Sequence, residues 1–267
     1  MFLINKNKCN IVIYLIALNI ILVLLLSSCL DSSSTLTPLA PVIPLELSIE
    51  EYELAQQPET DTGFFKPITE TAGEILAQHE SERGQVIAGL RLVYLENGQK
   101  IQAEMTPQPI QSTGSSNDGQ VINIKITQNG QSIFTKQSPV LTNDSFHGLW
   151  SFGNHWFAEI ENLNEGSFRS HTKGEIFRDG QSLNGLNDYT ESFGFQILHG
   201  KPFYFFEKFG RVGISYNSQD ISLGYDRVLH YGCCSMGILN PKMYENMVGF
   251  FAVRGDKWYY VEIGVFQ

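Results

Sequence analysis

Basic residues are scarce in this chain, and their scarcity limits the partners that it can bind. The 267 residues include 18 Lys and Arg against 28 Asp and Glu, a formal net charge of −10. Residues 1–28 contain two lysines and no acidic residue, so the rest of the chain has 16 basic against 28 acidic residues, a charge of −12. An acidic surface repels phosphate backbones and anionic lipid headgroups. We therefore expect no nucleic-acid partner.

The short motifs that identify common enzyme classes are also missing. The chain has no P-loop, no G-x-S-x-G nucleophile motif, no H-E-x-x-H zinc motif and no dinucleotide-binding fingerprint. Charged residues make up only 17% of the chain, while 42% is hydrophobic and 12% aromatic, which is typical of a folded protein with a sizeable core. We expect no cofactor, and a binding role rather than a catalytic one.

The only long hydrophobic run lies at the N-terminus. Lys6 and Lys8 precede an apolar stretch from Ile11 to Leu26, in which Asn19 is the only strongly polar residue. A helix of about 16 residues reaches about 24 Å, which is short of the roughly 30 Å of a bilayer core. A positive segment, an apolar segment and a small-residue exit are instead typical of a secretory signal peptide, with an uncleaved signal anchor as the alternative.

The apolar stretch ends in Leu26-Ser27-Ser28-Cys29, which resembles the lipobox of bacterial lipoproteins. The resemblance implies that residues 1–28 are removed and that Cys29 is acylated. It also implies that the chain is held by this lipid at a membrane of the bacterial cell envelope, on the extracytoplasmic side. Residues 29–45 are rich in Ser and Pro, as in an extended tether.

The chain has four cysteines, of which Cys9 would leave with the signal peptide and Cys29 would carry the lipid. Only Cys233 and Cys234 then remain, so a framework of long-range disulfides is excluded. One interpretation is a vicinal disulfide, which would be strained because adjacent Cα atoms lie about 3.8 Å apart in a trans peptide. The others are a pair of small buried residues, or a soft-metal or catalytic site with His230. Three metal ligands within five consecutive residues cannot easily form a tetrahedron, so we expect no metal.

Residues 46–84 predict a short helical or irregular segment. The sequence Ser48-Ile-Glu-Glu51 matches a capping box and predicts a helix from Ile49 to Gln56. A second helix is predicted from Thr69 to Glu82, with Gly84 as its stop signal.

Residues 85–267 have the pattern of a β-domain. An Asn-Gly turn at Asn97-Gly98 predicts a hairpin of Val86 to Leu95 with Lys100 to Met105. A second such turn, at Asn129-Gly130, predicts a hairpin of Val121 to Thr127 with Ser132 to Lys136. In the latter, Ile122, Ile124 and Ile126 fall on one face of the strand.

An internal repeat with a spacing of 55 residues occupies the second half of the chain. Seven residues of one copy match seven of the next: Tyr189, Gly194, Phe195, Gly200, Phe203, Tyr204 and Glu207 with Tyr244, Gly249, Phe250, Gly255, Trp258, Tyr259 and Glu262. A looser copy contains Gly148, Gly153, Trp156, Phe157 and Glu159. Each copy reads as a strand, a tight turn and an aromatic strand. The fold class that we expect is all-β, with antiparallel hairpin repeats in a propeller-like array or a twisted β-sandwich.

The middle copy predicts four strands in a row: Gly194 to His199, Lys201 to Lys208, Arg211 to Asn217 and Ile221 to Tyr225. Apolar residues at Phe203 and Phe205 on one face, and at Tyr204 and Phe206 on the other, predict a strand covered on both sides.

This copy resembles the bacterial WG-type repeat at Gly210-Arg-Val-Gly213-Ile-Ser-Tyr216 and Gly224-Tyr225-Asp226, although Val212 stands where that repeat has its Trp. The resemblance implies a β-array that binds a partner. The last copy ends after two strands. One hypothesis is that the hairpin Val121 to Lys136 completes it and so pairs the two ends of the domain; the alternatives are that the hairpin Gln85 to Met105 contributes or that the array is open.

Three groups of residues are candidates for ligand binding. His230 and Tyr231 lie in a predicted loop before the cysteine pair, and loops on rigid scaffolds often carry function. Trp150 and Trp156, with His147 and His155, form either an aromatic binding platform for a sugar or a peptide or core and turn positions, and Trp258 is a further aromatic candidate. Glu207 and Glu262 either meet as an acid–base pair or a Ca²⁺ site, or simply end strands.

These observations predict a lipid-anchored envelope protein that binds an unknown extracytoplasmic ligand or protein without catalysis. Two alternatives stay open: an envelope hydrolase that uses Glu207 and Glu262, and a thiol-redox protein that uses Cys233 and Cys234.

Overall fold

The structure is a computed structural model of the full chain. It describes residues 44, 46–57, 89–109, 120–140, 145–163, 172–231 and 240–265, all of which lie in the compact unit Pro41–Gln267. The predicted signal peptide with Cys29, the predicted helix Thr69 to Glu82 and the pair Cys233 and Cys234 lie outside the described residues. In the part that is described, no helix combines the length and the hydropathy needed to cross a bilayer.

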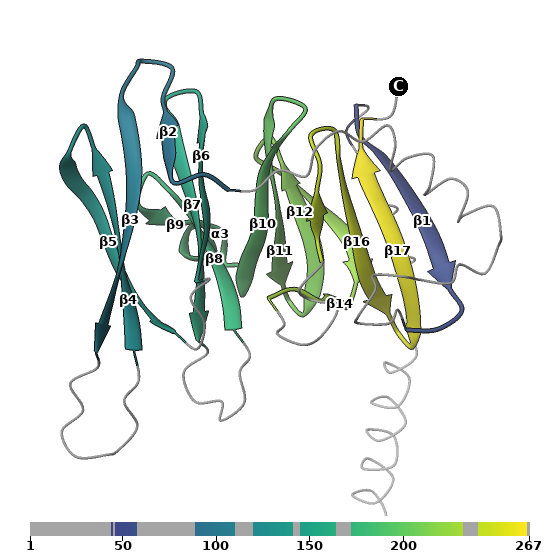
Figure 1. The fold of residues 1–267 in the computed structure, drawn as a ribbon. Coiled ribbons are helices and arrows are strands. Elements are labelled where there is room, and N and C mark those ends of the chain that lie inside the picture. Colours follow the sequence, from purple (N-terminus) through teal and green to yellow (C-terminus); the bar gives the residue numbers. More distant parts are fainter. Residues whose placement is uncertain are drawn as a thin grey trace, which may run out of the picture. The chain divides into compact units, whose positions relative to one another are not determined.

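The unit is built from antiparallel β-strands in four sheets, and the all-β prediction is confirmed (Figure 1). The first sheet contains β2 (Leu92–Tyr94), β3 (Lys100–Pro109), β4 (Gln120–Gln128) and β5 (Gln131–Val140). The second contains β6 (Phe146–Phe152), β7 (His155–Leu163), β8 (Thr172–Arg178) and β9 (Gln181–Ser182). The third contains β10 (Glu191–Leu198), β11 (Lys201–Lys208), β12 (Arg211–Tyr216) and β13 (Gln219–Tyr225). In these three sheets the strands pair in the order of the sequence.

The fourth sheet joins the beginning of the unit to its end. It contains β14 (Arg227–Val228), β15 (Lys242–Met243), β16 (Met247–Arg254), β17 (Lys257–Gly264) and β1 (Ser48–Leu54). Strand β1 pairs antiparallel with β17, with Ser48 opposite Gly264 and Leu54 opposite Trp258. The helix predicted from Ile49 to Gln56 is therefore wrong, because pairing with a strand about 200 residues away overrides a local capping pattern.

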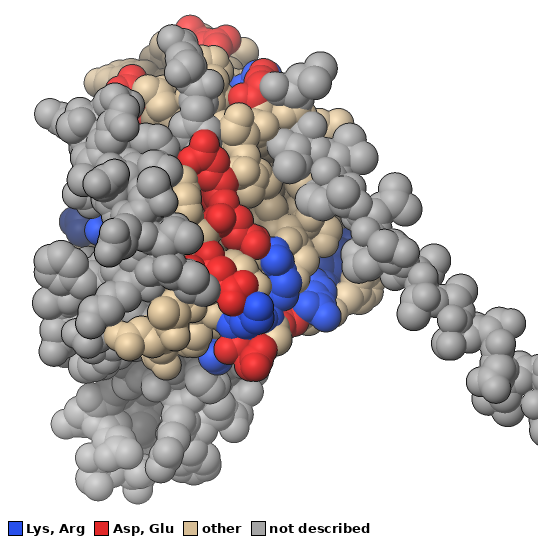
Figure 2. All heavy atoms as spheres, turned by 90° about the vertical axis from the view of Figure 1, so that its right-hand side faces the viewer, with Lys and Arg blue, Asp and Glu red and all other residues tan. Residues whose placement is uncertain are grey.

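Side-chain contacts hold β1 in place at this edge. Glu51 forms ion pairs with both guanidinium nitrogens of Arg254, at 2.7 and 3.2 Å, and accepts the hydroxyl of Tyr225. Lys257 forms an ion pair with Glu53 at 2.9 Å. Figure 2, which views this side of the unit, shows acidic and basic side chains adjacent to one another on the described surface.

The last repeat copy is completed by β1 and not by the predicted hairpin. That hairpin, β4 with β5, pairs with β3 in the first sheet instead. Its own form is as predicted: Asn129 and Gly130 both have positive φ, 50° and 86°, which is the backbone of a type I′ turn. The four strands predicted for the middle copy also form, as β10 to β13.

The four sheets pack face to face through three separate apolar cores. Ile101, Ile124 and Ile126 of the first sheet pack on Leu149 and Trp156 of the second. Strand β11 of the third sheet is covered on both faces, as predicted. Its buried residues Phe203 and Phe205 pack toward the fourth sheet, and Tyr204 and Phe206 toward the second.

Matching side chains of the two copies of the 55-residue repeat point to the same side of their sheets. Phe195 and Phe250 both point toward the preceding sheet, and Phe203 and Trp258 both point away from it. The looser copy is also a hairpin, β6 with β7, but its Trp156 faces the preceding sheet. Trp156 and Phe157 therefore point to the opposite faces from the matching aromatic pairs of the other two copies.

Candidate functional site

A pocket of about 220 Å³ opens between the second and third sheets. Residues that flank the β6–β7 turn at Gly153-Asn154 and the β8–β9 turn at Asp179-Gly180 line it, together with the β12–β13 turn at Asn217-Ser218 itself. The lining combines aromatic and aliphatic side chains with a few polar ones: Phe152, His155, Phe157, Arg178, Leu183, Pro202, Tyr204, Asn217 and Ser218.

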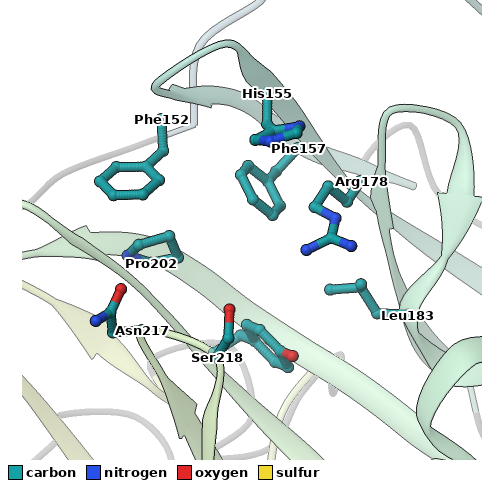
Figure 3. Close-up of a pocket in the computed structure, with 9 residues that line it drawn as sticks. Phe152, His155, Phe157, Arg178, Leu183, Pro202, Asn217 and Ser218 are labelled. Carbon is teal, nitrogen blue, oxygen red and sulfur yellow. The ribbon is translucent and has the colours of Figure 1, made fainter.

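The local folds place these side chains at the ends of rigid elements. Phe152 is the last residue of β6, and Arg178 is the last residue of β8. Leu183 begins the short helix α3 (Leu183–Asn187), whose first turn is capped by the hydroxyl of Ser182. Figure 3 shows Phe152, His155 and Phe157 across the cavity from Pro202, Asn217 and Ser218. The Arg178 guanidinium points into the cavity near Leu183.

The floor of the pocket is the smallest of the three cores between sheets. Phe157, Leu183 and Tyr204 belong both to the lining and to this core. Burial raises the pKa of Tyr204 above its ordinary value, so its phenol stays neutral at physiological pH. The floor therefore offers flat, uncharged rings to a ligand.

The polar groups of the pocket differ in how far the protein itself satisfies them. Nδ1 of His155 lies 2.5 Å from Asp179, whose other carboxylate oxygen accepts the backbone N–H of Trp156 at 3.0 Å. This pair orients the imidazole, whose side chain is 56% exposed. By contrast, the guanidinium of Arg178 has no hydrogen bond or ion pair within the described part of the chain. Its five N–H donors are available to a ligand.

A second polar cluster lies between the same two sheets and contains His230 and Tyr231. Glu159, only 3% exposed, accepts the backbone N–H groups of Gly194 and Phe195 at 3.0 and 2.7 Å. Those two residues form a β-bulge in β10, where Gly194 has a φ of 64°. The bulge takes both N–H groups out of the strand ladder, and the buried carboxylate satisfies them.

Tyr231 donates its hydroxyl to the same carboxylate, and its ring stacks on His147 with 4.3 Å between the ring centroids. Burial, followed by the charge of Glu159, raises the pKa of Tyr231 well above its ordinary value. The phenol is therefore a permanent hydrogen-bond donor under physiological conditions, which suits a structural link between two sheets more than proton transfer.

His230 is held between two oxygen acceptors. Its Nδ1 lies 2.7 Å from the carbonyl oxygen of Val228, and its Nε2 lies 2.8 Å from Glu191. A carbonyl oxygen only accepts, so Nδ1 carries a hydrogen, and the contact with Glu191 requires a further proton on one of the two partners. Glu191 also accepts the N–H of Gly174 from the second sheet at 2.6 Å. The structure thus brings His230 and Tyr231 together, but mainly into contacts that join the sheets.

The other predicted residues are dispersed. Trp156 is 4% exposed in the core between the first two sheets, and Trp150 packs on Phe195 with 5.1 Å between ring centroids. Trp258 lies on the outward face of the fourth sheet, with the Arg227 guanidinium 5.9 Å from its ring. The tryptophans therefore do not form one platform.

Glu207 and Glu262 are not brought together. Glu207 lies on the same face of β11 as Phe203 and Phe205, which face the fourth sheet. Glu262, which has no exposed surface, lies on the same face of β17 as Trp258 and Tyr260, and this is the face of the fourth sheet that points away from the third. The fourth sheet lies between the two carboxylates, so the structure gives no support to a hydrolase that uses them as a pair.

No group of three or more His, Cys, Asp or Glu side chains among the described residues is arranged to hold a metal ion. The interpretations of Cys233 and Cys234 stay predictions, since both residues lie outside the described ranges. Comparison of the chain with protein-family models, curated proteins and solved structures gives no match. The geometry of the described residues therefore carries the functional argument.

Proposed function

We propose that the protein is a lipid-anchored binding module of the bacterial cell envelope, and that it holds a ligand in the pocket between its second and third sheets. The observation that carries the binding role is the pocket itself, where aromatic walls meet an arginine with no partner among the described residues. Convergent polar groups in a largely apolar concavity are what ligand sites share.

A non-catalytic role is favoured by the chemistry of the pocket. Its imidazole, at His155, is oriented by Asp179, but the lining contains no cysteine, lysine or acidic residue to act with it. Ser218 is the lining residue whose hydroxyl could act as a nucleophile, but it lies on the wall opposite His155 in Figure 3. Rigid turns that carry polar groups above an aromatic floor suit recognition.

The envelope location rests on the signal peptide and on Leu26-Ser27-Ser28-Cys29, and a fractionation experiment tests it. In a bacterial host, the full-length chain is expected in the membrane fraction, with a mass that begins at Cys29 and includes acyl groups. Cys29→Ser should abolish the acyl mass, whereas Cys9→Ser, within the signal peptide, should leave it unchanged. A membrane-bound product that retains residues 1–28 would instead identify an uncleaved signal anchor.

The binding role is tested by screening sugars, peptides and metabolites against the detergent-solubilised chain, with Phe152→Ser as the pocket variant. Phe152 is 36% exposed, so its loss removes ligand contact at little expense to the core. We expect a ligand whose affinity falls about tenfold or more in Phe152→Ser. Ile133→Ser is the matched control, because Ile133 is 39% exposed on the first sheet, outside the pocket lining. If no ligand distinguishes these two variants, the pocket is not the binding site.

A further inference from the structure

We infer that the pocket recognises a sugar acid, with Arg178 binding the carboxylate and the aromatic walls covering the sugar ring. This inference rests on the proposed function and names the ligand class of the same site.

The charge balance of the pocket calls for an anion. Arg178 ends β8 beside Phe157, its neighbour on β7, and no described residue gives its guanidinium a hydrogen bond or an ion pair. None of the nine lining residues is acidic. A partly buried guanidinium without a partner is poorly solvated, and a carboxylate matches its fork of donors with two parallel hydrogen bonds.

Two acidic side chains that act on lining residues are already engaged. Asp179 binds His155 and the backbone N–H of Trp156. Asp220, whose charge acts on Tyr204, accepts the hydroxyl of Tyr189 at 2.7 Å with both of its oxygens. In a protein with a net charge of −10, the Arg178 guanidinium thus points into a cavity where no described residue compensates its charge. A ligand carboxylate completes the arrangement.

The rest of the lining matches a ring that bears hydroxyl groups. Phe152, Phe157 and Pro202 present flat apolar surfaces on facing walls, as Figure 3 shows. The side chains of Asn217 and Ser218 add donors and acceptors that pair with hydroxyls. An amino acid fits less well, because the lining has no carboxylate for its ammonium group.

The volume limits the size of the bound unit. About 220 Å³ is below the roughly 300–1,000 Å³ of pockets that enclose drug-sized ligands. The pocket therefore accommodates one monosaccharide unit, which is either a free sugar acid or the last residue of an acidic polysaccharide. Both present the same carboxylate and ring.

Calorimetric titration of the full-length chain in detergent tests this ligand class. The probes are D-galacturonate, its neutral counterpart D-galactose, acetate as a carboxylate without a ring, and a linear trigalacturonate. We expect galacturonate to bind about tenfold or more tightly than galactose and acetate, since each lacks one half of the recognised chemistry. Trigalacturonate that binds more tightly than the monosaccharide identifies a polysaccharide end as the ligand, and equal affinity identifies the free sugar acid.

Two variants connect the affinity to the pocket. Arg178→Gln should weaken galacturonate about tenfold or more, while Arg91→Gln, the same change at an exposed site on the first sheet, should not. Asn217→Asp keeps Arg178 and places a negative charge in the lining. Since Asp also tolerates the positive φ of 50° at this turn, the variant should fold and should also lose affinity for galacturonate.

Galactose binding as tightly as galacturonate would overturn the proposal, and so would unchanged affinity in both pocket variants. If the screen then yields an uncharged ligand that depends on Phe152, the ligand class is wrong and the binding role of the pocket stands. If no ligand depends on Phe152, both fail.

Discussion

Phe209 occupies a backbone conformation that rarely suits an aromatic residue. It is the first central residue of the β11–β12 turn, with a φ of 53°. The equivalent position holds Asn129, Asp179, His199 and Asn217 in the other turns of this type, and these residue types are the ones enriched at positive φ. The Phe209 side chain is 89% exposed and so gains almost nothing from burial.

Phe209→Asn should therefore stabilise the protein by about 0.5–1 kcal/mol, because the strain is relieved and little packing is lost. The free energy of unfolding from urea denaturation measures this. Tyr94→Asn is the control, since Tyr94 is 61% exposed and is not among the residues with positive φ. A drop in stability for Phe209→Asn would mean that the aromatic ring stabilises the fold in spite of its exposure.

The residues of the pocket could have been located only in part from the sequence. The turns at Gly153-Asn154, Asp179-Gly180 and Asn217-Ser218 are recognisable as turns from local chemistry. Repeats that stack in register bring such turns to one edge of the molecule. Phe152 and Arg178 each directly precede one of these turns, so the repeat could have placed them at that edge. That Arg178 has no partner among the described residues depends on neighbours from another sheet, which local patterns do not contain.

Among the elements, hairpins follow local rules and sheet edges do not. Asn-Gly turns specify which strands pair and in which register, and the hairpins β2–β3 and β4–β5 form around them. Strand β1 shows the opposite case. Its Tyr52 and Leu54 alternate with Glu51 and Glu53, a strand pattern too short to outweigh the capping box, and only the free edge of β17 decides between the two.

For the molecule as a whole, stacked sheets were predictable because aromatic residues occupy both faces of β11. The number of sheets, and the identity of β1 as the strand that completes the last one, were not predictable. They depend on contacts between residues far apart in the chain, for which the sequence holds no local signal.

The burial of tyrosine hydroxyls makes the stability of the whole molecule sensitive to alkali. The pKa values of five tyrosines are raised in the fold, in each case chiefly by burial: Tyr189, Tyr204, Tyr216, Tyr225 and Tyr231. An unfolded tyrosine ionises near pH 10. Because the folded pKa values lie higher, this contribution to stability is complete below about pH 10 and is lost as the pH rises above it. Each tyrosine that would ionise in the unfolded chain but stays protonated in the fold adds to this loss.

We therefore expect the phenolate absorbance at 295 nm to rise together with unfolding, seen as loss of the near-ultraviolet circular dichroism. Tyr216→Phe should make the pH dependence shallower without removing a hydrogen bond, since no described residue pairs with this hydroxyl. Full ionisation of the tyrosines near pH 10 in a chain that keeps its near-ultraviolet signal would contradict the prediction.

The pairing of β1 with β17 also determines where the molecule yields under mechanical tension. The whole N-terminal stretch of the chain precedes β1, so a pull along that stretch reaches the body through an edge strand of seven residues. Tension along the strand loads the entire ladder in shear, whereas tension across it peels the ladder from Ser48 onward. A pull from the N-terminal side meets side-chain ion pairs one after another, first that of Glu46 with Lys201 on the third sheet, then Glu51 with Arg254, and then Glu53 with Lys257. We therefore expect this edge to open one ion pair at a time, and before the sheets behind it separate.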